Sequence, residues 1–335
     1  MASRTVPYIS LRDFDRRKDE IAKELIDAAE NIGFFVLVDQ ESPSKKDITD
    51  MFELSARYFA LPEEIKAKVP FIRDENCGWE KDAQVRPSTG VADPKESLQL
   101  QAFRADTYWP TDLPGIPEFR ERCLEFMDKT QALSLKILSL FAVALGFPPD
   151  FFTEAHDVTK GDCLSTLRLL QYHDATGKNF GPNSWRAGAH TDFDCLTLLY
   201  QQDGGDGLEV CPGREAHTSF ARGDDWTPVP ARTGEITVNI GDMLMAWSED
   251  RFRSLFHRVR VPGPNDNQKP RLSIGYFNQP RPGVLVDGPT HKYAAQTAKE
   301  YIVNAMHRNY LAAQQLKKEQ QTVAMNVPTV AVAQV

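Results

Sequence analysis

The first third of the chain places hydrophobic residues at helical spacing, interrupted once by a continuous apolar run. Arg16 to Asn31 and Ser44 to Ala60 repeat apolar residues every three or four positions, which predicts two amphipathic helices. Between them, Phe34 to Val38 is apolar at every position and follows Gly33, so we expect a buried strand there. Proline is favoured in the first turn of a helix, and a short helix is predicted at Pro62 to Lys68.

The middle of the chain contains a long polar stretch and then the most apolar helix. Residues 74–110 are polar, rich in glycine and proline, and without a clear period. A stretch of this length without regular structure is uncommon in a compact domain unless it is functional. We therefore interpret it as a candidate lid or part of a substrate pocket. Pro117 to Gly146 predicts the longest helix, and its nearly all-apolar second half should make it the most buried one.

Beyond residue 164 the pattern changes to short strands separated by turns. Strands are expected at Leu164 to His173, Cys195 to Gln201, Leu208 to Cys211, Ile236 to Asn239, Met243 to Ser248, Phe256 to Val261 and Arg271 to Phe277. Many short strands at close spacing indicate a sandwich or barrel. Thr297 to Gln320 predicts a last amphipathic helix.

Together these elements predict one structural unit of mixed α/β class. We expect an N-terminal helical and strand region at 1–115, a long core helix at 116–150 and a β core at 151–290. A C-terminal helix at 291–320 follows, and the tail at 321–335 has no periodicity and is expected to be disordered. A chain of 335 residues can bury a large core without disulfides.

Composition and charge exclude several classes of protein. The chain has 39 basic and 47 acidic residues, a net charge of −8, which disfavours a dedicated nucleic-acid-binding protein. Its five cysteines include no Cys-x-x-Cys pair, which favours thiols in a reducing compartment. No apolar signal core is visible at the start, and the longest apolar stretch, Leu133 to Phe147, is short for a membrane span. We therefore expect a cytoplasmic protein without a membrane partner. A homo-oligomer is compatible with the sequence but not predicted by it.

One His-x-Asp pair occurs among the seven histidines. His190 and Asp192 lie two positions apart, so on a strand their side chains point the same way and could bind one metal ion. Alternation around His257 places it on the inward face of its strand, while Arg258 and Arg260 face water. Two histidines and one carboxylate form the facial triad of non-haem Fe(II) oxygenases. On spacing alone, a chance pair and a hydrogen-bonded core histidine remain the alternatives.

A buried arginine is predicted 14 positions after His257. Arg271 and Ser273 share one face of the predicted strand, and an arginine inside an apolar barrel needs a buried anion. A guanidinium binds a carboxylate through two parallel hydrogen bonds, and the serine hydroxyl adds a donor. The distal carboxylate of 2-oxoglutarate fits this requirement. A structural pair between Arg271 and an internal acid is the alternative.

These residues together resemble a known family. His190-Thr191-Asp192, His257 and Arg271-Leu272-Ser273 are similar to the His-x-Asp, His and Arg-x-Ser pattern of isopenicillin N synthase-like Fe(II)/2-oxoglutarate-dependent dioxygenases. Further similar segments include Asn31 to Phe35, Leu196 to Gln201, Gly207 to Val210 and Val238 to Asp242. The resemblance covers most of residues 6–310. Leu167 to Tyr172 and the segments around His190 and His257 resemble thymine 7-hydroxylase-type members most.

The resemblance implies a double-stranded β-helix (jelly-roll) core at 151–290, flanked by an N-terminal helical segment and a long helix. Fe(II) would be bound by His190, Asp192 and His257. The distal carboxylate of 2-oxoglutarate would be bound by Arg271, Ser273 and Tyr172. With O₂ as the second cosubstrate, decarboxylation of 2-oxoglutarate would be coupled to hydroxylation, desaturation or ring modification of a small organic molecule. Secondary metabolism or heterocycle oxidation is the expected setting.

Three further residues are candidates for substrate binding. Arg168 shares a strand face with Tyr172, so it would contact a polar or acidic group of the substrate or pair with an internal acid. Asn239 is a polar residue in an apolar strand, where it would bind the substrate or cap the Gly241 turn. Phe277 lies on the Arg271 face, where it would wall the pocket or belong to the core.

Three other functions compete with this interpretation. A 2-oxoglutarate-independent Fe(II) oxidase of the same fold would also carry the Arg-x-Ser motif, although Tyr172 favours 2-oxoglutarate. A non-catalytic jelly-roll binding protein is disfavoured because all three metal ligands are present. A zinc hydrolase would leave Arg271 and Ser273 without an evident role.

Overall fold

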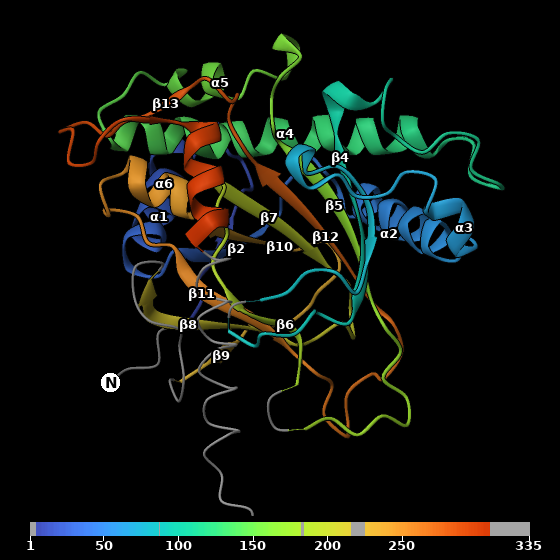
Figure 1. The fold of residues 1–335 in the computed structure, drawn as a ribbon. Helices are drawn as coiled ribbons and strands as arrows, with labels where there is room; N and C mark the ends of the chain where they lie inside the picture. The colour runs from blue at the N-terminus through green and yellow to red at the C-terminus, as the bar shows by residue number, and fades with distance from the viewer. Residues whose placement is uncertain (1–4, 87, 182–183, 216–224, 309–335) are drawn as a thin grey trace, which may run out of the picture.

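A computed structural model describes residues 5–86, 88–181, 184–215 and 225–308 of the chain. Within these residues, two β-sheets lie one above the other, and helices cover the outer side of the larger sheet (Figure 1). The large sheet has eight strands in the order β1-β2-β10-β7-β12-β5-β4-β3. The small sheet has four strands in the order β6-β11-β8-β9.

The large sheet draws its strands from both halves of the chain. Its strands are β1 (Tyr8–Ser10), β2 (Phe34–Val38), β3 (Gly78–Lys81), β4 (Lys95–Gln101), β5 (Thr166–Tyr172), β7 (Leu196–Gln201), β10 (Ile236–Ile240) and β12 (Arg271–Asn278). The small sheet consists of β6 (Trp185–His190), β8 (Leu208–Glu215), β9 (Thr227–Pro228) and β11 (Leu255–Arg260). Four strands of the large sheet therefore precede residue 115.

The helices lie before, between and after the strands. They are α1 (Lys18–Asn31), α2 (Lys45–Phe59), α3 (Glu63–Lys66), α4 (Phe119–Ala144), α5 (Phe151–Ala155) and α6 (Asp242–Trp247), with a further helix at 298–308. Short 3-10 turns occur at Arg73–Glu75, Ala102–Arg104 and Val158–Lys160, and β13 (Leu285–Val286) pairs with β14 (Gln296–Thr297). No helix among the described residues is long and apolar enough to cross a lipid bilayer.

Alternation along the strands gives the large sheet two different faces. Leu167 and Leu169 of β5 join the main hydrophobic core with residues of α1, α2 and α4. Their neighbours Leu170 and Tyr172 point the other way and pack against the small sheet. The same alternation on β12 directs Arg271 and Ser273 to this inner face, because Arg271 lies opposite Tyr172.

Helix α4 is fixed to the large sheet by buried polar contacts as well as by apolar packing. The Gln131 Oε1 atom accepts hydrogen bonds from the Tyr276 hydroxyl at 2.7 Å and from the Asn278 amide at 3.0 Å. The same amide donates to the Ser134 hydroxyl at 2.8 Å. Because buried polar groups are costly without partners, these bonds specify how the helix lies on the sheet.

The structure corrects two details of the pattern analysis. The expected strand at Met243 to Ser248 is helix α6. Short apolar runs do not distinguish a strand from a buried helical turn, and this run contains no β-branched residue. Arg258 was expected to face water, but its guanidinium carbon lies 4.0 Å and 3.8 Å from the ring centres of Trp185 and Trp226. An apolar surface on the small sheet accounts for the difference, because a guanidinium stacks well on indole rings.

Strands β1, β3, β4 and β6, and the two-residue strands β9, β13 and β14, were not predicted. Strands β3 and β4 lie within the polar stretch 74–110, and β4 carries polar residues on the face where an ordinary strand is apolar. The last helix is observed over 298–308, and the rest of the expected helix lies outside the described residues. The expected disordered tail at 321–335 also lies outside them.

Candidate metal centre and cosubstrate pocket

The predicted metal ligands come together at the end of the small sheet. His190 ends β6 and lies directly opposite His257 of β11, so strand pairing brings the two imidazoles side by side. The ring centres are 4.3 Å apart. Asp192 follows β6 in a turn, and its carboxylate oxygens lie 3.8 Å from the His190 Nε2 atom and 3.7 Å from the His257 Nε2 atom. One ligand atom from each residue lies within 4.8 Å of the others.

Backbone contacts fix the tautomer of both histidines. The Nδ1 atom of His190 lies 2.7 Å from the Gly188 carbonyl oxygen, and that of His257 lies 3.3 Å from the Leu255 carbonyl oxygen. A carbonyl only accepts, so Nδ1 carries the proton in each ring and the Nε2 lone pairs face Asp192. Burial lowers the pKa of both imidazoles, which favours the neutral form that binds metals.

The Asp192 carboxylate is held by two donors from neighbouring strands. Its Oδ2 atom accepts hydrogen bonds from the Thr197 hydroxyl at 2.7 Å and from the Asn239 amide at 2.9 Å. Asn239 therefore contacts a metal-ligand candidate, a role that the sequence analysis did not consider. Because these donors fix the carboxylate rotamer, they prepare it to bind a cation together with the two imidazoles.

Arg271 is buried without an acidic partner among the described residues. Its Nε atom donates to the Gly205 carbonyl at 2.6 Å, and its Nη2 atom donates to the Gln201 side chain at 2.8 Å. The Nη1 atom has no hydrogen-bond partner there. The guanidinium carbon lies 5.1 Å from the ring centre of Tyr172. A buried arginine with an unused donor is suited to bind an anionic ligand. The alternative, in which Arg271 pairs with an internal acid, does not agree with these contacts.

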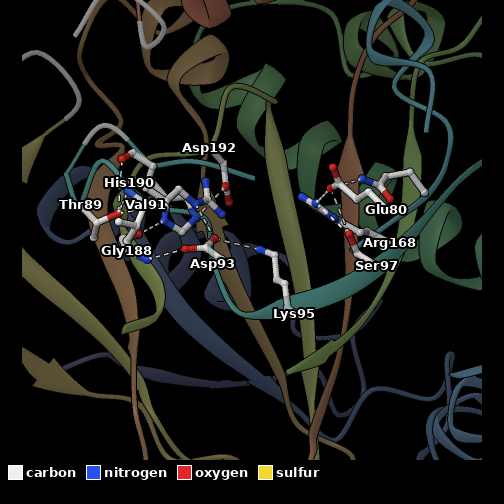
Figure 2. A network of polar contacts seen from close by, with 12 residues as sticks. Glu80, Thr89, Val91, Asp93, Lys95, Ser97, Arg168, Gly188, His190 and Asp192 are labelled. Atoms are coloured by element: carbon white, nitrogen blue, oxygen red, sulfur yellow. Dashed lines mark hydrogen bonds and ion pairs between the residues drawn. The ribbon is translucent and has the colours of Figure 1, made fainter. Parts of the chain in front are cut away.

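Sequence reasoning missed a second charged group beside the metal centre. Asp93 accepts hydrogen bonds from Lys95 at 3.1 Å, from Arg86 at 2.9 Å and from the Gly188 backbone at 3.1 Å. Figure 2 shows how this group joins the segment before β4 to the strand that carries His190. Burial lowers the pKa of Lys95 to about 7. Asp93 and Lys95 lie in the polar stretch 74–110, far from His190 in the sequence. The local sequence therefore did not indicate that they lie close to His190.

Arg168 has an internal acid as its partner. Its Nη2 atom donates to the Glu80 carboxylate of β3 at 2.6 Å and to the Ser97 hydroxyl of β4 at 3.0 Å (Figure 2). The Phe277 ring lies over Gly275, where an added Cβ would approach the ring to 3.0 Å. Arg168 and Gly275 are opposite each other on β5 and β12, and both Arg168 and Phe277 line the cavity described below.

A cavity of about 1660 Å³ adjoins the metal-ligand candidates and most of the residues described above. It is lined by all three metal-ligand candidates, by Tyr172 and Ser273, and by the substrate candidates Arg168, Asn239 and Phe277. Arg271 does not line it. Lys95 and Gln99, which belong to the polar stretch 74–110, line the cavity. This agrees with the expected role of that stretch in forming a substrate pocket.

Family models and curated relatives match most of the described chain. The family model of the 2OG-Fe(II) oxygenase superfamily matches residues 165–280. A second model, described as non-haem dioxygenase in morphine synthesis N-terminal, matches residues 6–115. A UPF0676 protein of Schizosaccharomyces pombe is 35% identical, with 84% of each chain covered. Proline hydroxylase buaE of Petromyces alliaceus is 31% identical, with 82% of this chain and 86% of that protein covered.

Among solved structures, thymine 7-hydroxylase from Neurospora crassa bound to α-ketoglutarate and 5-formyluracil is similar in fold. Its TM-score is 0.76 at 26% identity, with 89% of this chain and 94% of that chain covered. The chain belongs to the 2OG-Fe(II) oxygenase superfamily. It is an Fe(II)/2-oxoglutarate-dependent dioxygenase that couples decarboxylation of 2-oxoglutarate to oxidation of a small organic substrate, as predicted.

Proposed function

We propose that His190, Asp192 and His257 bind Fe(II) and that Arg271, Ser273 and Tyr172 bind the distal carboxylate of 2-oxoglutarate. The observation that carries the proposal is the convergence of two Nε2 atoms and one carboxylate within 4.8 Å. When bound, Fe(II) and 2-oxoglutarate together supply the oxidising power for attack on an unactivated C–H bond. The roles of the chain's own residues follow from their contacts.

The metal ligands hold their positions through the surrounding backbone. The two carbonyl contacts on the Nδ1 atoms keep His190 and His257 in the tautomer that presents Nε2. Thr197 and Asn239 restrain the Asp192 carboxylate and satisfy its lone pairs. All three ligands come from one end of the small sheet, so one side of the centre faces the cavity.

Arg271 supplies the charge that a dicarboxylate cosubstrate needs. Gln201 and the Gly205 carbonyl orient its guanidinium, and the remaining Nη1 donor is free to bind a carboxylate oxygen. Ser273 lies on the same strand face and lines the cavity. Because both side chains are buried, the ion pair forms away from water, where charge-assisted hydrogen bonds are strong.

The finer features of the function are also proposals. We propose that the substrate is a small molecule of secondary metabolism or a heterocycle, since similar proteins include validamycin A dioxygenase and proline hydroxylase. The acidic net charge supports a protein that binds neither nucleic acid nor membrane. We also propose a cytoplasmic location and one structural unit with a jelly-roll core. We propose no oligomeric state.

The test is an anaerobic titration of metal-free protein with Fe(II) and then 2-oxoglutarate. Chelated 2-oxoglutarate gives a weak visible charge-transfer band, and the wild type should develop it. His257→Ala should lose Fe(II) binding. Arg271→Met should keep Fe(II) binding but weaken 2-oxoglutarate binding by about a hundredfold, because a buried charge pair is lost. Arg281→Ala, which removes an arginine paired with Asp162, is the matched control and should behave as the wild type.

Each alternative has its own outcome in this titration. Wild type that binds Fe(II) without forming the band would be a 2-oxoglutarate-independent oxidase. Unchanged 2-oxoglutarate affinity in Arg271→Met would refute the assignment of the carboxylate site. Unchanged Fe(II) binding in His257→Ala would refute the triad.

A further inference from the structure

Four polar residues form the inner face of strand β4, and three of them, Lys95, Gln99 and Gln101, line the cavity. Lys95, Ser97, Gln99 and Gln101 alternate along β4 and face inward, and all four are buried. The apolar residues between Ser97 and Gln101 face the helices instead. A strand with a buried polar inner face is unusual, because buried polar groups stabilise a fold only when they have partners. The partners of these residues therefore indicate what the surface binds.

One buried atom of this face and one of the neighbouring strand β5 have no hydrogen-bond partner among the described residues. They are the Nε atom of Arg168 and the Oε1 atom of Gln99. Both residues line the cavity that contains the metal ligands. They lie directly opposite each other on β4 and β5, so their side chains are neighbours on one face. One is a hydrogen-bond donor and the other is an acceptor.

Glu80 fixes the orientation of both side chains. Its Oε1 atom accepts hydrogen bonds from Arg168 at 2.6 Å and from the Gln99 Nε2 atom at 3.0 Å. Rotating the Gln99 amide by half a turn would bring its oxygen against this carboxylate oxygen, and two acceptors repel. The Gln99 oxygen therefore keeps an unused lone pair, and the unused Arg168 donor belongs to the residue paired with it on β5.

We infer that this pair recognises an amide edge of the substrate, a carbonyl oxygen adjacent to an N–H group. The carbonyl accepts from the Arg168 Nε atom, and the N–H donates to the Gln99 Oε1 atom. A carboxylate fits less well, because one of its oxygens faces the Gln99 oxygen and Glu80 already neutralises Arg168. The substrate class is thus a neutral lactam or a primary amide, because a trans secondary amide points its N–H away from its carbonyl oxygen.

The inference rests on the proposed function, since it places the substrate in the cavity of the same metal centre. It makes Gln99 and Arg168 residues that determine specificity. A site built to hydrogen-bond a polar group rejects analogues that lack the group, because its buried atoms are then left unpaired. The Phe277 ring beside Gly275 supplies an apolar surface for the rest of the molecule.

The test compares four small probes on wild-type protein loaded anaerobically with Fe(II) and 2-oxoglutarate. The probes are 2-piperidone, N-methyl-2-piperidone, cyclohexanone and cyclopentanecarboxylate. Binding is measured by calorimetry and by the shift of the visible band. We expect 2-piperidone to bind at least about tenfold more tightly than each of the others, because only it offers both an acceptor and a donor.

Gln99→Leu should reduce the preference for 2-piperidone over cyclohexanone to near unity while keeping the band. Gln171→Leu is the matched control, because this glutamine lies on the opposite face of β5 and donates to Glu96. Its preference should equal that of the wild type. Should Gln99→Leu fail to fold, the probe comparison on the wild type decides alone.

The two proposals fail in different ways. Absence of the band in the wild type refutes the proposed function. A wild type that forms the band but binds cyclohexanone or the carboxylate as tightly as 2-piperidone overturns the amide inference. So does a band-forming wild type that binds none of the probes, or a folded Gln99→Leu protein that keeps the preference.

Discussion

Lys95 shows how burial tunes a single side chain in this pocket. Its ammonium group contacts Asp93 and lies 5.7 Å from the ring centre of Tyr172. The positive charges of Arg86 and Arg168 oppose its protonation, while Asp93 favours it. Desolvation is the largest influence and lowers its pKa from 10.5 to about 7. The residue is therefore close to the point where it changes charge at neutral pH.

This depressed pKa predicts how stability depends on pH. Between about pH 7 and pH 10.5 the unfolded chain holds a proton on Lys95 that the folded protein releases. The free energy of unfolding should therefore rise with pH across this window, by at most about 1.4 kcal/mol per pH unit from this group. In Lys95→Met that contribution should vanish. Urea unfolding of both proteins at several pH values measures it, and parallel pH profiles would contradict the prediction.

The hydroxyl that supports Asp192 gives a second prediction at the residue scale. Thr197→Val keeps the side-chain shape but removes a hydrogen bond to the carboxylate. Fe(II) affinity should fall by about ten- to a hundredfold, as for other residues that orient metal ligands. Thr130→Val removes a buried hydroxyl bonded to Tyr200 on the helical side of the sheet, so it should leave Fe(II) affinity unchanged. Equal affinities in the two variants would show that Thr197 has no such role.

Individual elements are joined at positions where the backbone leaves little space. Gly33 connects α1 to β2 with a φ of 76°, a conformation that favours glycine. Its amide donates to the Ala28 carbonyl, and its carbonyl accepts from the Ile240 amide of β10. The turn thus fixes the register between the first helix and the middle of the large sheet.

A pair of glycine substitutions separates backbone strain from steric conflict at this junction. A Cβ at Gly33 would lie 1.8 Å from the Arg253 carbonyl oxygen, whereas a Cβ at Gly177 would meet nothing within 4 Å. Gly177 has a similar φ of 71°. Gly177→Ala should cost about 1 kcal/mol of unfolding free energy, and Gly33→Ala at least about 3 kcal/mol. Chemical denaturation tests this, and equal losses would show that the backbone moves freely at Gly33.

The whole molecule depends on a sheet shared between the two matched regions. Residues 6–115 supply β1 to β4, and residues 165–280 supply the strands beside them. Strand β2 pairs with β10, and β4 pairs with β5. The two regions therefore share one hydrophobic core and one cavity.

It follows that residues 116–335 should not fold alone. Strands β5 and β10 would each lose a neighbour, and exposed strand edges promote aggregation. We expect this fragment to be insoluble or to lack near-ultraviolet circular dichroism, and co-expression with residues 1–115 to restore both properties. A soluble fragment with cooperative unfolding would show that the second region is an independent domain.

The sequence by itself determined the long elements and the class of chemistry, that of an Fe(II)/2-oxoglutarate-dependent oxygenase. Hydrophobic periodicity located α1, α2 and α4, because a helix that packs on a sheet must repeat its apolar residues. The donor types in His190, Asp192 and His257 pointed to iron, because few side chains can bind it. Pairing of β6 with β11, which the pattern did not predict, brings the two histidines together.

Only the tertiary structure decided the polar side of the pocket. Asp93, Lys95 and Gln99 lie in a stretch whose polar residues read as a loop, since the apolar signal of β4 comes from its outer face alone. Pairing of β4 with β5 places Lys95 opposite Tyr172 and Gln99 opposite Arg168. Each buried charge finds its partner on a strand that is distant in the sequence, as Arg168 does with Glu80. The local sequence does not indicate such contacts.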